Sequence, residues 1–170
     1  CILVASDEKA KTFCKKPVWI RCLGAATTTV NLAGRNLFSG LTVAREAGKQ
    51  AYKMAGITAA DIDVAEVHDC FTIAEMMAYE DLGFAAPGAG KELIKNKETY
   101  KEGRIPVNVD GGLLSKGHPI GATGGSQIRT IVLQLRDEAG EIQVDNPQIG
   151  LIHNIGGVGL YGNVTILSRF

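Results

Sequence analysis

Apolar positions recur at two different spacings along the chain, and together they predict a layered α/β domain. Spacings of three and four place Val43, Ala47, Ala51 and Met54 on one face of a helix over 42–54, which Gly56 ends. Short apolar runs bounded by glycine, proline or polar residues predict strands over 18–26, 64–67, 106–109, 150–155 and 160–167. We therefore expect a mixed five-stranded sheet covered by helices, with the last two strands forming a hairpin.

Further helices are predicted over 7–14, 72–83 and 119–139. Thr72 and Glu75 have the spacing of a capping box, and Pro119 suits the first position of a helix that Gly140 ends. The weak periodicity of 84–105 predicts a long connection or lid. Glycines 121, 124 and 125 are expected to let another element approach the backbone of the last helix closely.

The first six residues, Cys1 to Ser6, have the pattern of a buried strand and begin without a methionine. We expect the chain to be a fragment of a longer protein. Pro17 interrupts the pattern after the helix over 7–14, so a boundary between 1–16 and 17–170 is predicted there.

The length and net charge of the chain limit the kinds of molecule that it is expected to bind. The chain has 170 residues, enough for one core, and a formal net charge of zero. A neutral chain is not expected to bind nucleic acid or an anionic membrane surface, so a small molecule or another protein is the expected partner. No apolar run reaches the length of a membrane span and no signal peptide is evident, so we expect a cytoplasmic protein.

The four cysteines show neither disulfide nor zinc-site spacing, and we expect reduced thiols and no metal site; they are Cys1, Cys14, Cys22 and Cys70. All three histidines fall in turns between predicted elements, at 68–71, 117–119 and 153–157. Next to Pro119, His118 is expected to remain neutral at a helix start and to donate a ring N–H to a developing anion. The alternative is that this turn is only a tight connection. The glycine-rich run from Gly111 to Ser126 has neither the spacing of a phosphate-binding loop nor that of a dinucleotide-binding motif.

Three motifs, in their order along the chain, resemble the C-terminal half of a thiolase. They are His68-Asp69-Cys70-Phe71, Gly117-His118-Pro119-Ile120-Gly121-Ala122-Thr123-Gly124 and His153-Asn154-Ile155-Gly156-Gly157. The first is typical of the sterol-carrier-protein-type and archaeal branch, where most thiolases have Asn-Glu-Ala-Phe. The resemblance implies a thiolase fold and a Claisen-type exchange that makes or cleaves a 3-ketoacyl-CoA. It also implies coenzyme A thioesters as substrates and no metal or organic cofactor.

The resemblance also implies roles for single residues. His118 matches the histidine that donates to the thioester oxygen and helps to activate the nucleophile, and His68 stands where an asparagine usually holds an oxyanion-hole water. The common Cys-x-Gly motif is replaced by Asn154-Ile155-Gly156, so Cys70 becomes the candidate acid/base thiol, and we expect a neighbouring histidine to lower its pKa. Supporting positions are Asn154, Gly156, Gly157 and Gly117 at the oxyanion site, and Phe71 and Pro119 toward the substrate.

In a thiolase the acyl-accepting cysteine lies in the N-terminal half, and Cys1 has no context that would activate it. Residues 1–16 resemble the end of that half and 17–170 the C-terminal domain. We therefore expect an N-terminal thiolase half as a partner, a homo-oligomer, and an isolated chain that is inactive and self-associates. Two alternatives remain open: a non-catalytic lipid-transfer or scaffold module, and a retro-aldolase of the same superfamily. A peroxisomal location is a further alternative, although the chain lacks a C-terminal Ser-Lys-Leu.

Overall fold

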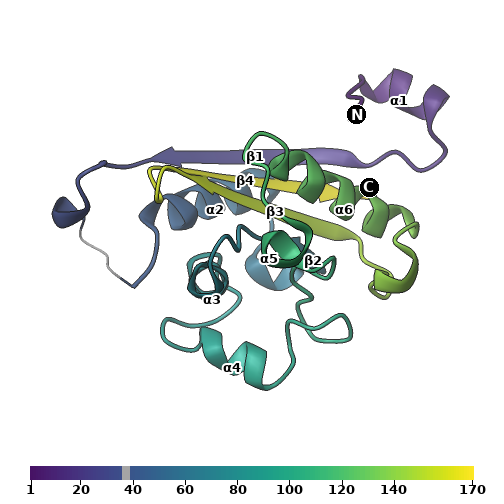
Figure 1. Ribbon diagram of the computed structural model, residues 1–170. Coiled ribbons are helices and arrows are strands. Elements are labelled where there is room, and N and C mark those ends of the chain that lie inside the picture. Colours follow the sequence, from purple (N-terminus) through teal and green to yellow (C-terminus); the bar gives the residue numbers. More distant parts are fainter. Residues whose placement is uncertain (36–38) are drawn as a thin grey trace.

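A computed structural model describes residues 1–35 and 39–170 of the chain (Figure 1). One mixed sheet has the strand order β1-β4-β3-β2. Its strands are β1 (Trp19–Thr27), β2 (Val64–Glu66), β3 (Ile149–Gly156) and β4 (Tyr161–Ser168). β4 is antiparallel to both β1 and β3, whereas β2 is parallel to β3. The predicted mixed sheet with a terminal hairpin is confirmed.

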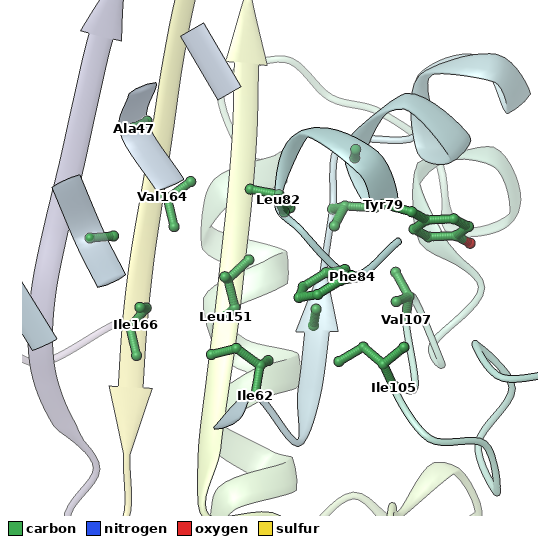
Figure 2. Packing of buried hydrophobic residues seen from close by; sticks show 14 of the residues in the cluster. Ala47, Ile62, Tyr79, Leu82, Phe84, Ile105, Val107, Leu151, Val164 and Ile166 are labelled. Atoms are coloured by element: carbon green, nitrogen blue, oxygen red, sulfur yellow. The ribbon is translucent and has the colours of Figure 1, made fainter. Parts of the chain in front are cut away.

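Helices cover both faces of the sheet. They are α1 (Asp7–Phe13), α2 (Thr42–Ala55), α3 (Thr72–Asp81), α4 (Gly90–Lys95), α5 (Gly112–Lys116) and α6 (Thr123–Arg136), with short 3₁₀ turns at Leu32–Gly34, Ala59–Asp61 and Gly140–Ile142. Successive side chains of a strand point to opposite faces, so β3 contributes Leu151 to the core under α2 and α3, and Ile152 to the core under α6. Figure 2 shows Leu151, Val164 and Ile166 packed in the larger core.

Helix α2 packs unusually close to the sheet. A Cβ on Gly24 of β1 would stand 1.9 Å from the carbonyl oxygen of Ala47, so the helix backbone itself contacts the strand. Because α2 presents alanine and glycine toward the sheet, no long side chain separates the two layers. Close backbone approach was expected instead at the glycines of the last helix. Within the described residues nothing approaches Gly121 or Gly125, where a Cβ would have no heavy atom within 4 Å, so this chain itself makes no close approach at these two glycines.

The sheet has four strands in the described part of the chain, not the expected five. The segment 106–109 forms a single parallel bridge, between Val107 and Ala65. The ladder stops there because Asn108 adopts a left-handed φ of 51°, and its side-chain oxygen, not a backbone carbonyl, accepts the Val67 N–H at 2.8 Å. Residues 1–6 are exposed and pair with no strand of the described chain, so the predicted strand there is also wrong.

One predicted cap and both predicted boundaries of the last helix change. Helix α3 begins at Thr72 without a capping box, because Glu75 accepts a hydrogen bond from Asn108 Nδ2 at 3.1 Å instead. Helix α6 begins at Thr123 after a separate turn at Pro119, and it ends at Asp137, which takes the left-handed position expected of Gly140.

The segment 84–105 is not a lid. It contains α4 and buries Phe84, Leu93 and Ile105 in the main core. Because these side chains are inside the protein, the segment is a fixed part of the fold. The helix predicted over 42–54 is confirmed as α2, with Gly56 in a left-handed conformation at its end. The prediction was wrong for Met54, which is exposed because it lies in the last turn of α2, beyond the sheet-facing residues.

Candidate active site

The candidate site lies at the carboxyl ends of the two parallel strands, where ligands and catalytic groups collect in α/β sheets. The last paired residues are Glu66 of β2 and Ile152 of β3. Continuing that register by two residues places His68 beside Asn154. The turn that carries His68, Asp69 and Cys70 follows β2 directly and leads into α3.

His118 reaches the same place from the turn between α5 and α6. The centroids of the His68 and His118 rings are 4.9 Å apart, and the rings meet edge to face at 85°. Gly117 ends α5 with a φ of 94°, a conformation that favours glycine, and His118 is the next residue after this turn. The two motifs, distant in sequence, therefore meet in the fold.

The Thr123 hydroxyl holds the His118 ring by its Nδ1 atom. The two atoms are 2.7 Å apart, and the same hydroxyl lies 3.2 Å from the Pro119 carbonyl oxygen. The hydroxyl can accept from Nδ1–H while donating to Pro119, or it can donate to Nδ1 itself. Both neutral tautomers are therefore accommodated, and Nε2 can serve either as a proton acceptor or as a hydrogen-bond donor. His118 precedes α6 by a separate turn, outside the first turn of the helix where the dipole acts most strongly.

His68 is a buried histidine that favours its neutral form. Burial lowers its pKa, the neighbouring His118 lowers it further, and the Asn154 side chain opposes the change. Within the described residues its Nδ1 atom has no hydrogen-bond partner. A neutral ring with one N–H can hold a water or an oxygen of a substrate, which is the chemistry that was expected of this position.

Asn154 is oriented by a residue that the sequence analysis missed. Its Nδ2 donates to Gln127 Oε1 at 2.6 Å, and Gln127 Nε2 donates to the His153 carbonyl oxygen at 3.3 Å. Gln127 is fully buried on α6. It lies four residues before the core residue Ile131, so the helical period already placed a polar side chain on the buried face. Gly156 and Gly157 follow Asn154 at the end of β3.

Cys70 is partly exposed and lies two residues after His68 in the same turn. Burial is the main cause that raises its pKa, and the charge of Asp69 adds to the effect. The expectation that a nearby histidine lowers this pKa was therefore wrong. The thiol is the resting form, which suits a proton donor better than a ready nucleophile. Next to it, Phe71 is 71% exposed, and Pro119 across the cluster is also exposed, so both are accessible from solvent.

His153 differs from the other two histidines. Its ring is buried, and neither ring nitrogen has a partner among the described residues. Burial, with a smaller effect of His68, lowers its pKa to about 3. Burial therefore favours the neutral form of His153, and it separates this histidine from the other two, with which it was grouped on sequence position.

No group of three or more His, Cys, Asp or Glu side chains has metal-site geometry in residues 1–35 and 39–170. In the same residues, no helix combines the length and apolar character needed to cross a bilayer.

Comparison with known proteins agrees with the geometry. Among curated relatives, acetyl-CoA acetyltransferase of Methanothermobacter thermautotrophicus is 41% identical over 168 residues, which cover 99% of this chain and 44% of that protein. Human sterol carrier protein 2 is 43% identical over 117 residues, covering 69% of this chain and 21% of that protein. The chain thus spans less than half the length of these relatives.

A solved structure, an Ltp2-ChsH2(DUF35) aldolase, superposes with a TM-score of 0.76 at 25% identity and covers 88% of this chain and 39% of that one. The family model described as "Thiolase C-terminal domain-like" matches residues 24–169. Both the sequence match and the fold point to one family, and the chain belongs to the thiolases through their C-terminal domain.

Proposed function

We propose that this chain is the C-terminal half of a coenzyme A-dependent acyltransferase site, which makes or cleaves 3-ketoacyl-CoA. The observation that carries the proposal is the pair of His68 and His118 rings, 4.9 Å apart at the carboxyl end of the parallel strands. Two imidazoles that can each present an N–H provide donors for the oxygen of a thioester, whose charge increases as a nucleophile attacks or an enolate forms. Asn154, fixed by Gln127, adds a positioned amide beside them.

In this proposal Cys70 is the acid/base. During cleavage the thiolate of the nucleophilic cysteine in the N-terminal half bonds to the β-carbonyl carbon. The bond between the α- and β-carbons then breaks, its electron pair passes to the leaving enolate, and the acyl group stays on that cysteine as a thioester. The Cys70 thiol protonates the α-carbon of the enolate. The Cys70 thiolate then takes the proton of the incoming coenzyme A thiol, whose sulfur attacks the acyl-cysteine and releases acyl-CoA and the cysteine thiolate. A raised thiol pKa supports the protonation step, because the proton is present when the enolate forms. The chemistry uses side chains and the thioester itself, with no metal or organic cofactor.

The nucleophilic cysteine comes from an N-terminal thiolase half, which we propose as the partner of this chain. The assembled protein is proposed to be a homo-oligomer of the cytoplasm, with a role in lipid metabolism. In that arrangement residues 1–16 are the end of the N-terminal half and 17–170 the C-terminal domain. Residues 1–6 are exposed, which is compatible with a segment that contacts the N-terminal half.

A retro-aldolase is the second candidate, favoured by the superposition on the aldolase structure. The two reactions differ in their co-substrate, since thiolytic cleavage consumes a coenzyme A thiol and retro-aldol cleavage does not. Cys70 and His118 are both present here and favour thiolytic chemistry. A cleavage rate that is independent of free coenzyme A would instead favour the aldolase.

Proton exchange tests the acid/base assignment. The chain is combined with a thiolase N-terminal half whose nucleophilic cysteine is replaced by alanine, and acetyl-CoA is incubated with it in D₂O. We expect deuterium to enter the acetyl methyl group, and Cys70→Ala to slow this exchange by about 10²–10⁴-fold. Mass spectrometry of the thioester measures the rate.

The matched control is Cys14→Ala, which removes a thiol that is also partly buried but lies at the end of α1, outside the site. It is expected to leave the exchange unchanged. Exchange at the full rate in Cys70→Ala would remove Cys70 from the mechanism.

A further inference from the structure

The two turns that carry the site histidines are tied together by hydrogen bonds that cross between them. A side chain from each turn region accepts from the main chain of the other. Asn108, ahead of the His118 turn, accepts the Val67 N–H through Oδ1 at 2.8 Å. Asp69, next to His68, accepts the Leu113 N–H through Oδ1 at 2.7 Å. Val67 directly precedes His68, and Leu113 lies on α5, whose C-cap residue Gly117 directly precedes His118.

Asn108 is held in an uncommon conformation and has every polar group engaged. Its φ of 51° is left-handed, which non-glycine residues adopt rarely. Its N–H donates to the Ala65 carbonyl at 2.9 Å, and its carbonyl accepts from the Gly111 N–H at 2.9 Å. Its Nδ2 donates to Glu75 on α3. Such a residue persists only where its surroundings determine it strongly, and these conformations cluster at functional sites.

The Asp69 side chain packs directly against the start of α5. Its carboxylate is buried, 2% exposed, and its second oxygen lies 3.5 Å from the Leu114 N–H. A Cβ on Gly112 would stand 2.1 Å from Asp69 Oδ2. Because Gly112 has no side chain, the first N–H groups of α5 can close on the carboxylate. The distance between the two turns is therefore set at Asp69.

We propose that Asn108 and Asp69 are positioning residues that fix the spacing of the His68 and His118 rings, and we name this pair of crossed contacts the crossed lock. We expect loss of the crossed lock to separate the two rings, and this expectation is independent of the proposed function. We also expect its loss to impair catalysis, and this second expectation rests on the proposed function. Neither residue faces the reacting atoms in this account. Each acts by holding the backbone from which the other turn's histidine projects.

The test compares two glycines that share a backbone conformation. The φ angle is 61° at Gly112 and 69° at Gly56, which lies at the end of α2. Gly112→Ala drives a methyl group into Asp69, whereas the methyl group of Gly56→Ala meets no heavy atom within 4 Å in the described chain. Both substitutions bear the same left-handed alanine cost. With only three histidines in the chain, ring-to-ring nuclear Overhauser effects are readily assigned. We expect the effect between His68 and His118 in the unaltered chain and in Gly56→Ala, and its loss in Gly112→Ala.

Asp69→Ala removes the same contact without a steric clash and serves as the second variant should Gly112→Ala fail to fold. We expect it also to lose the ring-to-ring effect. Asp69→Asn keeps an oxygen that can accept from Leu113, and we expect it to retain the ring-to-ring effect. In the presence of a thiolase N-terminal half, kcat for thiolysis should fall by about 10²-fold in Gly112→Ala and Asp69→Ala with KM little changed, since a displacement near 1 Å costs about that much.

The outcomes separate the two proposals. A ring-to-ring effect that persists in both Gly112→Ala and Asp69→Ala would overturn the crossed lock, whatever the activity. Its loss with turnover equal to that of Gly56→Ala would establish the lock and contradict the catalytic role of the histidine pair.

Discussion

Replacing His118 with alanine is expected to lower kcat/KM for acetoacetyl-CoA thiolysis by about 10³–10⁴-fold, because the change removes an oxyanion donor and a proton acceptor together. The measurement uses the chain with a thiolase N-terminal half. Stability should change little, since His118 is exposed and its ring is held only by Thr123 in the described structure. The loss should therefore appear as activity and not as unfolding.

A graded comparison makes this result specific. Thr123→Val keeps the His118 ring but removes the hydroxyl that holds Nδ1, and we expect a smaller loss, about 10-fold, because the ring loses its orientation but not its chemistry. Turnover in His118→Ala equal to that of the unaltered protein would contradict the site. An equal loss in both variants would place the chemistry in the Thr123 hydroxyl.

The second large effect concerns stability. Gly24→Ala is expected to destabilise the chain by about 3 kcal/mol or more, because the new methyl group meets the Ala47 carbonyl oxygen at 1.9 Å. A backbone atom cannot rotate away, so the whole of α2 must move off the sheet. Urea unfolding measures this as a lower midpoint with an unchanged slope.

Gly125→Ala is the matched control, because it makes the same change on an exposed position of α6 where a Cβ has open space among the described residues. We expect it to leave the stability of the chain unchanged or to raise it by less than about 1 kcal/mol, the value for a helix interior, because Gly125 lies in the first turn of α6. Equal midpoints for the two variants would mean that α2 and the sheet are not in the close contact described.

Much of the fold follows from the sequence because periodicity reports which faces are buried. The α2 pattern, the β3–β4 hairpin and the turn after β2 are each encoded in neighbouring residues. The fifth strand could not be predicted correctly, since Val107 has the pattern of a strand but Asn108 ends its pairing through a side-chain contact with Val67. Such contacts depend on which segments meet, and that information is not local.

The same distinction applies to the site. His68 and His118 were recognised from their motifs, and the parallel register of β2 and β3 explains why the first lies beside Asn154. The direction of the Cys70 pKa was missed because it depends on burial and on the adjacent Asp69 more than on the nearby histidines. Gln127 was missed because a buried glutamine has no motif of its own.

The central claim is that this chain supplies half of a thiolase site and needs the other half for catalysis. The most direct measurement is coenzyme A-dependent cleavage of acetoacetyl-CoA by the 170-residue chain alone, by a thiolase N-terminal half alone, and by the two together. We predict cleavage only by the two together, dependent on free coenzyme A. Cleavage by the chain alone above a blank with free thiol, or none by a complex shown to have formed, would contradict the claim.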